Sequence, residues 1–575
     1  MDKQELASIL DEIAVFLELK GENVFKCNAY RNASRTIANL EQDLNDFHTP
    51  ADLSQIKGIG SSLAEKIYSF IQTGHFPLYE ELKAGIPTGI VEMLRIQGLG
   101  PKKARTLHEK LGIASIGELE YACRENRLLE IPGFGEKTQE NILKGIEYLK
   151  KSQGRFHLHE AKAAAGNLYE DLSRLSFVKH IEIAGSLRRY KETIKDIDLL
   201  ITTTKPEKVM EAFVSHPLVE DTIARGKTKS SVRLSSGINA DLRVVSDEEF
   251  PFALMYFTGS KEHNILMRGR ALKQGYKLNE YGLFRRDSNK SKALESEAEI
   301  FAELGLSYIP PELREDQGEI DAAEKKAIPK LVQFKDLRGL FHLHTPYSDG
   351  LPSIQDYVDY ARKRDWEYIG ISDHSQSAYY ANGLSLEKIE RQIREIDSIN
   401  GKIGGFRIFK GIESDILPDG SLDYPDNILA LFDFVIISIH SKFKMTRDEM
   451  TGRIIRAMQS PYATMLGHPT GRLLLGREGY QLDMEAIIKS AAANHVAIEL
   501  NSHPYRLDLD WRYIRRAIEA GVLISVNPDA HRLENMEYAE LGTGIARKGW
   551  CEPRHILNAQ SARQAQEFLR RKHAQ

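Results

Sequence analysis

The chain of 575 residues is long enough for several domains with full hydrophobic cores, and it has no apolar stretch of membrane-spanning length and no signal segment. Its three cysteines, Cys27, Cys123 and Cys551, are far apart and form no CxxC pair, which excludes a disulfide framework and a thiolate zinc site. The net charge of -4 gives no global sign of a nucleic-acid partner. We therefore expect a soluble protein of the reducing cytoplasm, in which any DNA contact comes from backbone groups and from local basic segments such as residues 261–290.

One motif occurs three times in the N-terminal region. Residues 56–66, 96–105 and 131–138 each contain an apolar residue, then Gly-apolar-Gly, then a polar helix start. The glycines allow a tight turn that leaves backbone N–H groups free at a helix N-terminus, where they can bind a phosphate. An ordinary helix connection explains one such turn, but three with matched flanks favour DNA binding. The repeats resemble helix-hairpin-helix elements, which bind the DNA backbone without reading its sequence, and the glycines concerned are Gly58, Gly60, Gly98, Gly100, Gly133 and Gly135.

A second motif surrounds the first repeat, with Lys26 and Tyr30 before it and Lys66 after it. These positions resemble the small lyase domain of the family X DNA polymerases. The resemblance implies that Lys66 is the Schiff-base lysine, that Lys26 contacts a 5′-phosphate and that Tyr30 supports the site. A lysine with a lowered pKa can attack the aldehyde of an abasic sugar. Phe25 and Ser62 replace a histidine and a lysine of polymerase beta, a member of that family, so 5′-phosphate binding is better supported than lyase chemistry.

The middle third contains a pattern typical of nucleotidyl transfer. Residues 181–189 predict a strand that runs into a Gly-Ser turn. Asp196 and Asp198 lie two residues apart on the next strand, so both point to one face, and Asp241 lies on a further strand. Three carboxylates on neighbouring strands can hold two Mg²⁺ ions. A lone Asp-x-Asp is usually only a solvated strand edge, but together with the Gly-Ser turn it resembles the nucleotidyltransferase signature.

The segment that follows, residues 256–268, resembles the nucleotide-sugar and minor-groove segment of the family X polymerases. The resemblance implies that Asn264 faces the incoming base and that Arg268 faces the template. The residues that it places around the deoxyribose are Tyr256, Phe257 and Gly259. The residues that it assigns to the triphosphate are Gly185, Ser186, Arg189 and Arg155.

The C-terminal region contains seven short apolar runs, six of which end in a side chain that can bind a metal. Helix-length amphipathic stretches such as 354–363 and 484–493 separate them and predict repeated βα units. The ends of parallel strands in a closed barrel meet at one face, so the ligands should converge there. The runs are residues 339–344, 368–374, 406–413, 434–440, 463–468, 496–501 and 522–531.

The side chains at these strand ends are His, Asp and Glu without Cys, which suits Zn²⁺ or Mn²⁺. Nine of them are too many for one ion, and two or three ions with a bridging carboxylate stabilise the attacking and leaving oxygens of phosphoester hydrolysis. Hydrogen-bonded histidines in a barrel core would explain one such residue but not nine. Residues 342–350 resemble the first signature of the PHP (polymerase and histidinol phosphatase) family. That resemblance assigns His342, His344, Glu413 and Asp529 to one ion, Glu413, His440 and His468 to a second, and Asp349, His374 and His531 to a third.

The order of these regions is similar to that of the bacterial family X DNA polymerases with a C-terminal PHP domain. It implies a multidomain α+β and α/β fold with a helical helix-hairpin-helix N-terminal region, a nucleotidyltransferase palm with a thumb, and a distorted seven-stranded βα barrel. The expected domains are a lyase-like 5′-phosphate-binding domain (1–82), a fingers-like DNA-binding domain (83–150), the palm (151–247), the thumb (248–315), a linker (316–335) and the PHP phosphoesterase (336–575).

The resemblance implies a repair DNA polymerase that fills short gaps, as in base excision repair, and a metal-dependent 3′-5′ exonuclease in the barrel, with cleavage at abasic sites as a further expectation. The expected cofactors are Mg²⁺ in the palm and up to three Mn²⁺ or Zn²⁺ ions in the barrel. We expect a monomer in the bacterial cytoplasm, at work on the nucleoid, with gapped double-stranded DNA bearing a 5′-phosphate and dNTPs as partners and no membrane. Two alternatives stay open: the barrel is a small-molecule phosphatase or purely structural, or the chain is a DNA-end-binding scaffold, against which the intact aspartates count.

Overall fold

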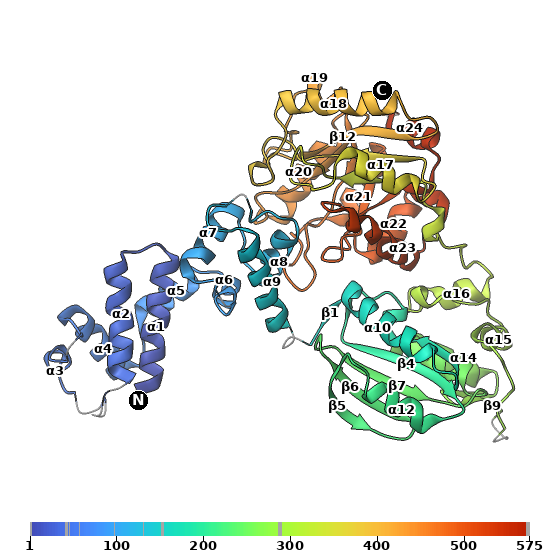
Figure 1. Cartoon of the computed structure of the whole chain (residues 1–575), viewed down its shortest axis with the longest axis horizontal. Helices are drawn as coiled ribbons and strands as arrows, with labels where there is room; N and C mark the ends of the chain where they lie inside the picture. The colour runs from blue at the N-terminus through green and yellow to red at the C-terminus, as the bar shows by residue number, and fades with distance from the viewer. Residues whose placement is uncertain are drawn as a thin grey trace. The chain divides into compact units, whose positions relative to one another are not determined.

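The computed structural model describes residues 3–570 except 39, 41–43, 45–46, 57, 97, 130, 151–153 and 286–289, so part of the basic segment 261–290 lies outside the described residues. The chain folds into two compact units, Met1–Leu149 and Lys150–Gln575 (Figure 1). Among the described residues, no helix is long and apolar enough to cross a membrane.

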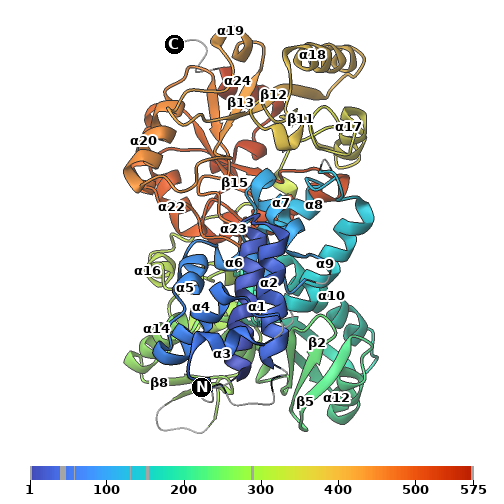
Figure 2. The same cartoon turned by 90° about the vertical axis from the view of Figure 1, so that its left-hand side faces the viewer.

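The first unit is built from helices, and α1 and α2 lie side by side in it (Figure 2). Their apolar faces form one core with residues such as Leu10, Ile37, Ile67 and Leu107. The three Gly-apolar-Gly repeats fall between α3 and α4, between α6 and α7, and between α8 and α9. The helices are α1 (Lys3–Leu19), α2 (Val24–Ala38), α3 (Pro50–Ser54), α4 (Ser61–Thr73), α5 (Pro77–Ala84), α6 (Thr88–Met93), α7 (Pro101–Leu111), α8 (Ile116–Arg124) and α9 (Glu136–Lys150).

The second unit begins with a five-stranded sheet in the order β2-β4-β7-β6-β5. β4 and β7 are parallel, and the other neighbours are antiparallel. Ile197 and Leu199 belong to the core that α10 and α12 form on one face, so Asp196 and Asp198, at alternate positions, point to the other face. The elements are β1 (Phe156–His157), α10 (Leu158–Ser173), β2 (Val178–Ile183), α11 (Gly185–Arg188), β3 (Thr193–Ile194), β4 (Asp196–Thr203), α12 (Pro206–Val214), β5 (Val219–Arg225), β6 (Lys229–Leu234) and β7 (Asn239–Val244).

A smaller subdomain follows the sheet, with a core of its own around Phe252, Met267, Leu283 and Phe301. The side chain of Ser260 accepts a hydrogen bond from the His263 backbone N–H and so starts α14. The elements are α13 (Phe250–Thr258), α14 (Lys261–Lys273), the hairpin of β8 (Tyr276–Asn279) and β9 (Gly282–Arg285), α15 (Glu297–Glu303) and the short 3₁₀ helix η2 (Pro311–Leu313).

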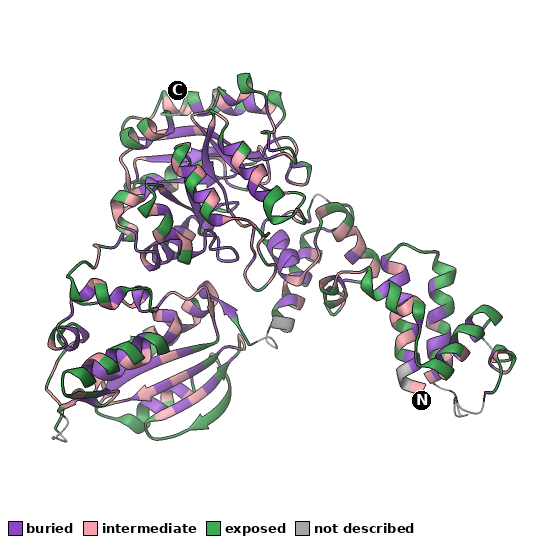
Figure 3. Cartoon of the chain, turned by 180° about the vertical axis from the view of Figure 1, so that it is seen from behind, coloured by how far each residue is buried: buried purple, intermediate pink, exposed green. Residues whose placement is uncertain are grey.

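The remainder is a barrel-like sheet of seven parallel strands in sequential order. Two backbone hydrogen bonds, from His344 to the Ala530 carbonyl (2.9 Å) and from Ala530 to the His342 carbonyl (3.0 Å), join its first strand to the segment after its last. Figure 3 shows the strands buried inside helices whose outer faces are exposed. The strands are β10 (Gly339–Leu343), β11 (Tyr368–Ile371), β12 (Arg407–Asp415), β13 (Phe434–Ser438), β14 (Ala463–Leu466), β15 (Ala497–Asn501) and β16 (Ile524–Asn527).

All seven predicted apolar runs are strands, and the helices predicted at 354–363 and 484–493 are confirmed as the first and fourth of the main barrel helices. Alternation of strand and helix therefore identified the architecture correctly. The main helices are α17 (Ile354–Arg362), α18 (Leu386–Asn400), α20 (Arg447–Met458), α21 (Met484–Ala493), α22 (Trp511–Glu519), α23 (Tyr538–Lys548) and α24 (Ala562–Arg570).

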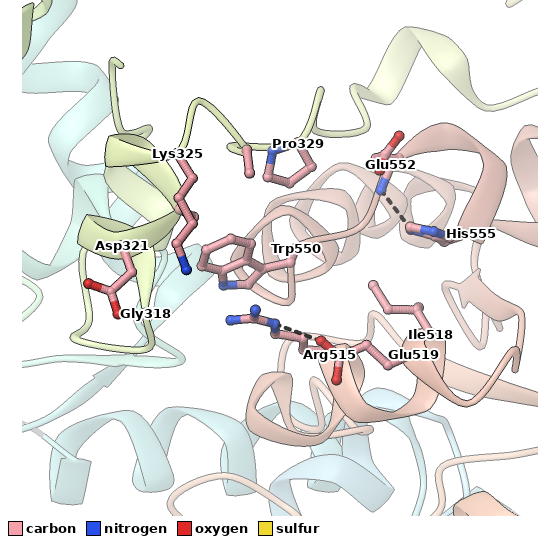
Figure 4. Close-up of a pocket in the computed structure, with 12 residues that line it drawn as sticks. Gly318, Asp321, Lys325, Pro329, Arg515, Ile518, Glu519, Trp550, Glu552 and His555 are labelled. Atoms are coloured by element: carbon pink, nitrogen blue, oxygen red, sulfur yellow. Dashed lines mark hydrogen bonds and ion pairs between the residues drawn. The ribbon is translucent and has the colours of Figure 1, made fainter. Parts of the chain in front are cut away.

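Segment 316–335, the expected linker, is packed against the barrel. It contains α16 (Glu319–Glu324), and the Val332 backbone N–H donates to the Cys551 carbonyl at 2.9 Å. Arg515 of the barrel donates to the Gln317 carbonyl (2.9 Å), and its guanidinium lies 4.2 Å from the centre of the Trp550 ring. Arg515 and Trp550 line a pocket between α16 and the barrel (Figure 4). The segment therefore fixes the smaller subdomain to the barrel.

Candidate active sites

The five-stranded sheet brings the three predicted aspartates to one edge. Asp198 and Asp241 are paired neighbours on β4 and β7, and Asp196 precedes Asp198 on the same face. Ser231 Oγ donates to Asp241 at 2.6 Å, and Lys229 Nζ lies 2.6 Å from its second carboxylate oxygen. Burial and the carboxylates of Asp196 and Asp241 raise the pKa of Asp198 to about 6. Carboxylates that repel one another in this way suit divalent cations, which would neutralise them.

Gly185 connects the Gly-Ser turn to these carboxylates. Its φ of +65° lies in the left-handed region, and a Cβ there would lie 2.2 Å from Asp198 Oδ2, so only glycine fits. It starts α11, on which Ser186 lies. Arg188 at the end of α11 donates from two nitrogens to Glu297, at 3.1 and 2.8 Å. Sequence reasoning missed Arg188, which anchors the turn to the smaller subdomain.

The arginines predicted to bind triphosphate are engaged by protein groups. Arg189 is buried and donates to Glu315 (3.1 Å) and to the Thr258 carbonyl (2.6 Å). Arg155 donates to Thr193 Oγ1 at 2.7 Å, where β1 pairs with β3. Their contact with a nucleotide stays a prediction.

The residues predicted to face the sugar and the base lie together where α13 meets α14. A Cβ at Gly259 would lie 2.5 Å from Asn264 Oδ1, which accounts for the glycine. Asn264 Nδ2 donates to the Tyr256 carbonyl (2.7 Å), and Arg268 Nε donates to the Asn264 carbonyl (3.3 Å). The rings of Tyr256 and Phe257 meet edge to face with centroids 5.3 Å apart. The structure thus brings all five residues into one group, held by hydrogen bonds and by an edge-to-face ring contact.

In the barrel, the nine predicted ligands converge at the C-terminal ends of the strands, and Glu413 on β12 lies among them. Its two carboxylate oxygens approach five imidazole rings at distances from 2.8 to 3.8 Å. A single carboxylate between so many rings is placed to bridge metal ions. The five rings belong to His342, His344, His374, His440 and His468.

Two further carboxylates complete the barrel site. Asp529 Oδ1 lies 3.2 Å from His344 Nε2 and 3.5 Å from His342 Nε2, and Asp349 Oδ1 lies 3.3 Å from His531 Nε2. The potential donor atoms form four overlapping groups, each with its atoms within 4.8 Å of one another. The groups are His344, Asp349, His374 and His531; His342, Glu413 and His468; His342, His344 and Asp529; and His374, Glu413 and His440. His440 and His468, expected to share an ion, therefore fall in separate groups.

The ring nitrogens of this site suit metal ions. Both nitrogens of His344 and of His374 are buried and make no hydrogen bond, and the same holds for Nε2 of His342 and Nδ1 of His468. A buried polar atom without a partner costs about 1–3 kcal/mol. Imidazole and carboxylate are the usual donors for Zn²⁺ and Mn²⁺. The residues present therefore fit a cluster of divalent cations.

The protonation states in the barrel differ from ring to ring. Burial, aided by His531 and His374, lowers the pKa of His344 to about 3, so its ring is neutral. Burial also opposes a charge on His440, but Glu413 and Asp415 outweigh it and raise the pKa of His440 to about 9. Metal binding must therefore displace a proton from His440 at neutral pH.

Three carboxylates behind the ligands were missed by sequence reasoning. Glu499 on β15 lies 2.5 Å from His342 Nδ1 and accepts from the His468 backbone N–H at 2.7 Å. Asp415 lies 2.6 Å from His440 Nδ1. Asp373 accepts from the Thr345 backbone N–H at 2.7 Å and holds the loop that follows His344. Such partners orient a metal-binding ring and select its tautomer. For Glu499 the sequence did offer a signal, because the run 496–501 has the form of the other strands but no metal-binding side chain at its end.

The first unit presents three hairpins of one geometry. The first glycine of each repeat has a positive φ, at which a side chain would be strained. The second glycine lies directly before the next helix, whose first N–H groups have no partner in that helix. The φ values are +101° at Gly58, +84° at Gly98 and +91° at Gly133, and the second glycines are Gly60, Gly100 and Gly135.

Cations lie near these hairpins. Lys66 Nζ donates to the buried Tyr30 hydroxyl at 3.2 Å, whereas the half-exposed Lys26 pairs with Glu22 at 3.1 Å. A cavity beside the second repeat is lined by Arg95, Lys103 and Lys144 among other residues. The structure therefore pairs Lys66 with Tyr30 as the lyase resemblance implies, and the roles of these residues toward DNA stay predictions.

Comparison with known proteins covers both units. Family profiles match at residues 1–76 (helix-hairpin-helix domain), 90–147 (SAM-like helix-hairpin-helix tandem), 253–315 (DNA polymerase beta thumb) and 341–503 (PHP domain). Over 573 residues the chain is 38% identical to DNA polymerase/3′-5′ exonuclease PolX of Bacillus subtilis (strain 168), an alignment that covers 99% of this chain and 100% of that protein. The chain belongs to the PolX family. The predicted membership, and the helix-hairpin-helix, thumb and PHP parts of the predicted fold, are confirmed.

This PolX-family chain is also similar, over less than half of its length, to proteins named as phosphatases. It is 26% identical over 245 residues to a "Probable phosphatase" of Caldicellulosiruptor saccharolyticus, covering 40% of this chain and 94% of that protein. It is 30% identical over 199 residues to a "Probable phosphatase" of Acetivibrio thermocellus, an alignment that covers 33% of this chain and 78% of that protein. These alignments cover most of each phosphatase and less than half of this chain.

Proposed function

We propose that this chain is a DNA-directed DNA polymerase that also removes nucleotides from 3′ ends, with one active site in residues 151–315 and the other in the barrel. The full-length similarity to a protein named DNA polymerase/3′-5′ exonuclease carries the proposal. The three aspartates on β4 and β7 and the buried His and carboxylate cluster supply a chemical basis for each activity. We assign the domains as the sequence predicts, with 336–575 as the nuclease.

In the palm, we assign Asp196 and Asp198 to two Mg²⁺ ions, with Asp241 on one of them. These ions would neutralise the triphosphate and lower the pKa of the primer hydroxyl. Asp241, held by Ser231 and Lys229, takes the proton of the primer 3′-hydroxyl. The freed oxygen attacks the α-phosphorus in line, and pyrophosphate leaves.

Around the nucleotide, Ser186 and Arg189 bind the triphosphate, with Arg155 and the backbone N–H of Gly185. The wall of Tyr256 and Phe257 excludes a 2′-hydroxyl from the sugar site. Close packing of Gly259 against Asn264 fixes this wall. Selection of dNTPs follows from the lack of room for an additional oxygen.

In the barrel, the nine ligands would hold up to three Mn²⁺ or Zn²⁺ ions, which would supply positive charge for the attacking and leaving oxygens of a phosphodiester. Glu413 would contribute to more than one of these ions, because its two carboxylate oxygens lie near the rings of His374 and His468. Glu499 and Asp415 orient His342 and His440 through Nδ1, so that each Nε2 faces the cluster. We include cleavage at abasic sites among the expected activities.

The first unit directs the enzyme to short gaps. The hairpins bind the DNA backbone, and Lys26 with the Tyr30–Lys66 pair binds the 5′-phosphate at the far side of a gap. We expect one chain to act as a monomer on each gap, in the bacterial cytoplasm. Lys66 is also the proposed Schiff-base lysine, with Phe25 and Ser62 in place of the histidine and lysine that polymerase beta has nearby.

One assay tests the proposal. Gapped DNA with a labelled primer is incubated with Mg²⁺ or Mn²⁺, with and without dNTPs, and the primer should lengthen with dNTPs and shorten without them. Hydrolysis of histidinol phosphate is measured in parallel. Hydrolysis of this monoester without shortening of the primer would make the barrel a small-molecule phosphatase, which its resemblance to the named phosphatases favours as the second candidate. Binding of DNA ends with neither reaction would leave only the scaffold.

A further inference from the structure

A short loop of the palm, residues 189–192, touches the barrel at each of its four residues. The loop joins the Gly-Ser turn, with Ser186, to the strand of Asp196 and Asp198. It therefore lies between the predicted triphosphate ligands and the predicted metal ligands. The contacts are Arg189 O to Lys548 Nζ (2.9 Å), the Tyr190 ring to Gly544, Lys191 Nζ to the Trp511 ring (5.7 Å to its centre) and Glu192 to Arg472 (2.6 Å).

The charged part of this contact is centred on Glu315. Its buried carboxylate lies 3.1 Å from Arg189, 3.0 Å from Lys191 and 2.6 Å from Lys548. Burial would raise the pKa of Glu315, but the three cations hold it below its usual range, so the carboxylate is charged. Lys548 is fully buried and also donates to the Glu312 carbonyl at 3.3 Å. A cation of the barrel thus shares one carboxylate with the palm arginine that faces the nucleotide.

The apolar part of the contact is equally specific. Tyr190 has a φ of +53°, an uncommon conformation for a non-glycine residue. Its ring lies where a Cβ on Gly544 of α23 would come within 2.0 Å of it. Lys162 donates to the Tyr190 hydroxyl (3.1 Å) and to Glu540 of the barrel (2.8 Å). The barrel helix therefore carries a glycine at the position where the ring needs space.

We propose that the barrel is a working part of the polymerase site: Lys548, through Glu315, and Gly544, through Tyr190, hold the loop 189–192 so that Arg189 meets the triphosphate. Lys548 is a positioning residue, since it touches no substrate. The inference rests on the proposed polymerase function and adds a role for the barrel that is independent of its metal site.

Loss of either contact should weaken nucleotide binding more than the chemical step, because the loop contains Arg189, whereas the aspartates lie on β4 and β7. Changes along such a network alter coupling by about 0.5–2 kcal/mol, which corresponds to a two- to thirtyfold change in KM. We therefore expect a higher KM for dNTPs with kcat within about twofold.

The electrostatic arm of the test uses Lys548→Met, which keeps most of the side chain and removes its charge. Arg547→Met is the matched control, because Arg547 is its neighbour on α23 and pairs with Glu312 at 2.6 Å instead of with Glu315. In the full-length protein, KM for dATP on gapped DNA should rise about tenfold in Lys548→Met and stay within twofold in the control.

The steric arm uses Gly544→Ala, which changes no charge and places a methyl group against the Tyr190 ring. Its control is Gly166→Ala on α10, where an added Cβ meets no atom within 4 Å. Gly544→Ala should raise KM for dATP, and Gly166→Ala should not. Removal of 3′ nucleotides should stay within about twofold in all four variants, which also reports that the barrel is folded.

Binding of Mg·dATP by calorimetry gives a readout besides turnover. Wild-type protein that neither extends a primer nor binds Mg·dATP would overturn the proposed function. If the wild-type protein is active and both Lys548→Met and Gly544→Ala bind dATP as tightly as the wild type does, only the role of the barrel is overturned. An equal rise of KM in Lys548→Met and Arg547→Met would also overturn it, since any loosening of the interface would then suffice. If Lys548→Met does not fold, Gly544→Ala alone decides.

Discussion

The two candidate active sites of this chain are built in opposite ways. In the barrel seven of the nine predicted ligands are buried, and the side chains of the other two, Asp349 and His440, are only 9% and 6% exposed. A second set of carboxylates, Glu499 and Asp415, holds the rings of His342 and His440 in place. In the palm Asp196 is exposed, Asp198 and Asp241 are half-buried, and the two arginines predicted to bind the triphosphate, Arg189 and Arg155, donate to protein groups. The barrel site is thus assembled before its substrate arrives, whereas the palm site is completed by metal, nucleotide and primer.

This difference matches the two reactions. A nuclease site that acts on many DNA ends needs only a fixed charge cluster and room for one phosphodiester. A polymerase must select one nucleotide at each step, so part of its binding energy is kept for the correct substrate. The predictions that follow test whether the two sites are independent and differently organised.

The largest expected effects come from removal of metal ligands. The double change His342→Ala with His344→Ala should lower 3′ removal by on the order of 10³-fold or more, because a cation that lacks two imidazoles no longer stabilises the charge of the transition state. Gap filling should survive. Degradation of end-labelled DNA measures the loss, and unchanged 3′ removal would assign that activity to another part of the chain.

A loss of similar size is expected in the palm. Asp241→Ala should lower nucleotide addition by on the order of 10³-fold or more while 3′ removal continues, since the carboxylate that accepts the primer proton is lost. Primer extension at saturating dNTP measures it. If a folded Asp241→Ala variant also loses 3′ removal, the two sites are not independent.

A smaller effect on metal affinity tests whether the carboxylates behind the barrel ligands hold that site in its assembled form. Glu499→Gln should weaken Mn²⁺ binding in the barrel by about 10- to 100-fold, because the amide no longer holds His342 as a charged carboxylate does. Glu485→Gln is a matched control, since Glu485 is an exposed partner of Arg516 on the barrel surface. Calorimetric Mn²⁺ titration in a background that lacks all three palm carboxylates (Asp196→Ala, Asp198→Ala and Asp241→Ala) reports the barrel alone, and equal affinities in the two variants would contradict the assembled site.

The pH dependence of metal binding should also separate the sites. Without metal, nearby carboxylates raise the pKa of His440 to about 9 and hold the pKa of His342 well above its usual value against the effect of burial, so both rings must lose a proton on binding. Mn²⁺ affinity in the barrel should therefore rise at least tenfold per pH unit up to about pH 9. Asp198 has a pKa of about 6, so palm affinity should rise only up to about pH 6 and then level off. Mn²⁺ titrations between pH 5.5 and 9 measure this dependence. The variant without palm carboxylates reports the barrel, and the double change His342→Ala with His344→Ala reports the palm. Parallel pH profiles of the two variants would refute the contrast.

The smallest expected effect concerns the first unit. A downstream 5′-phosphate should speed extension across a short gap by about two- to fivefold over a 5′-hydroxyl, since an exposed cation contributes only modestly to phosphate binding. Lys26→Ala should remove that preference, and Lys83→Ala on α5 should keep it. Equal rates for both DNA ends in the unchanged protein would withdraw the role given to Lys26.

Much of this protein could be predicted from its sequence because the signals are local. Gly-apolar-Gly repeats specify a backbone conformation that other residues avoid, and Gly58, Gly98 and Gly133 adopt it. Strands followed by a metal-binding side chain specify a barrel and its active face, because parallel strands all end on that face. The nine metal ligands between His342 and His531 could therefore be predicted from the sequence, before the structure gave the distances between them.

What the tertiary structure alone decided are the contacts between segments far apart in the chain. Glu499 is one carboxylate among many until β15 places it 2.5 Å from His342, and Lys548 is an ordinary helical lysine until folding buries it against Glu315. Segment 316–335 has the composition of a linker, yet Val332 and Arg515 join it to the barrel. No local pattern marks such pairs, because their partners lie more than 150 residues away and the pairing depends on how the domains pack.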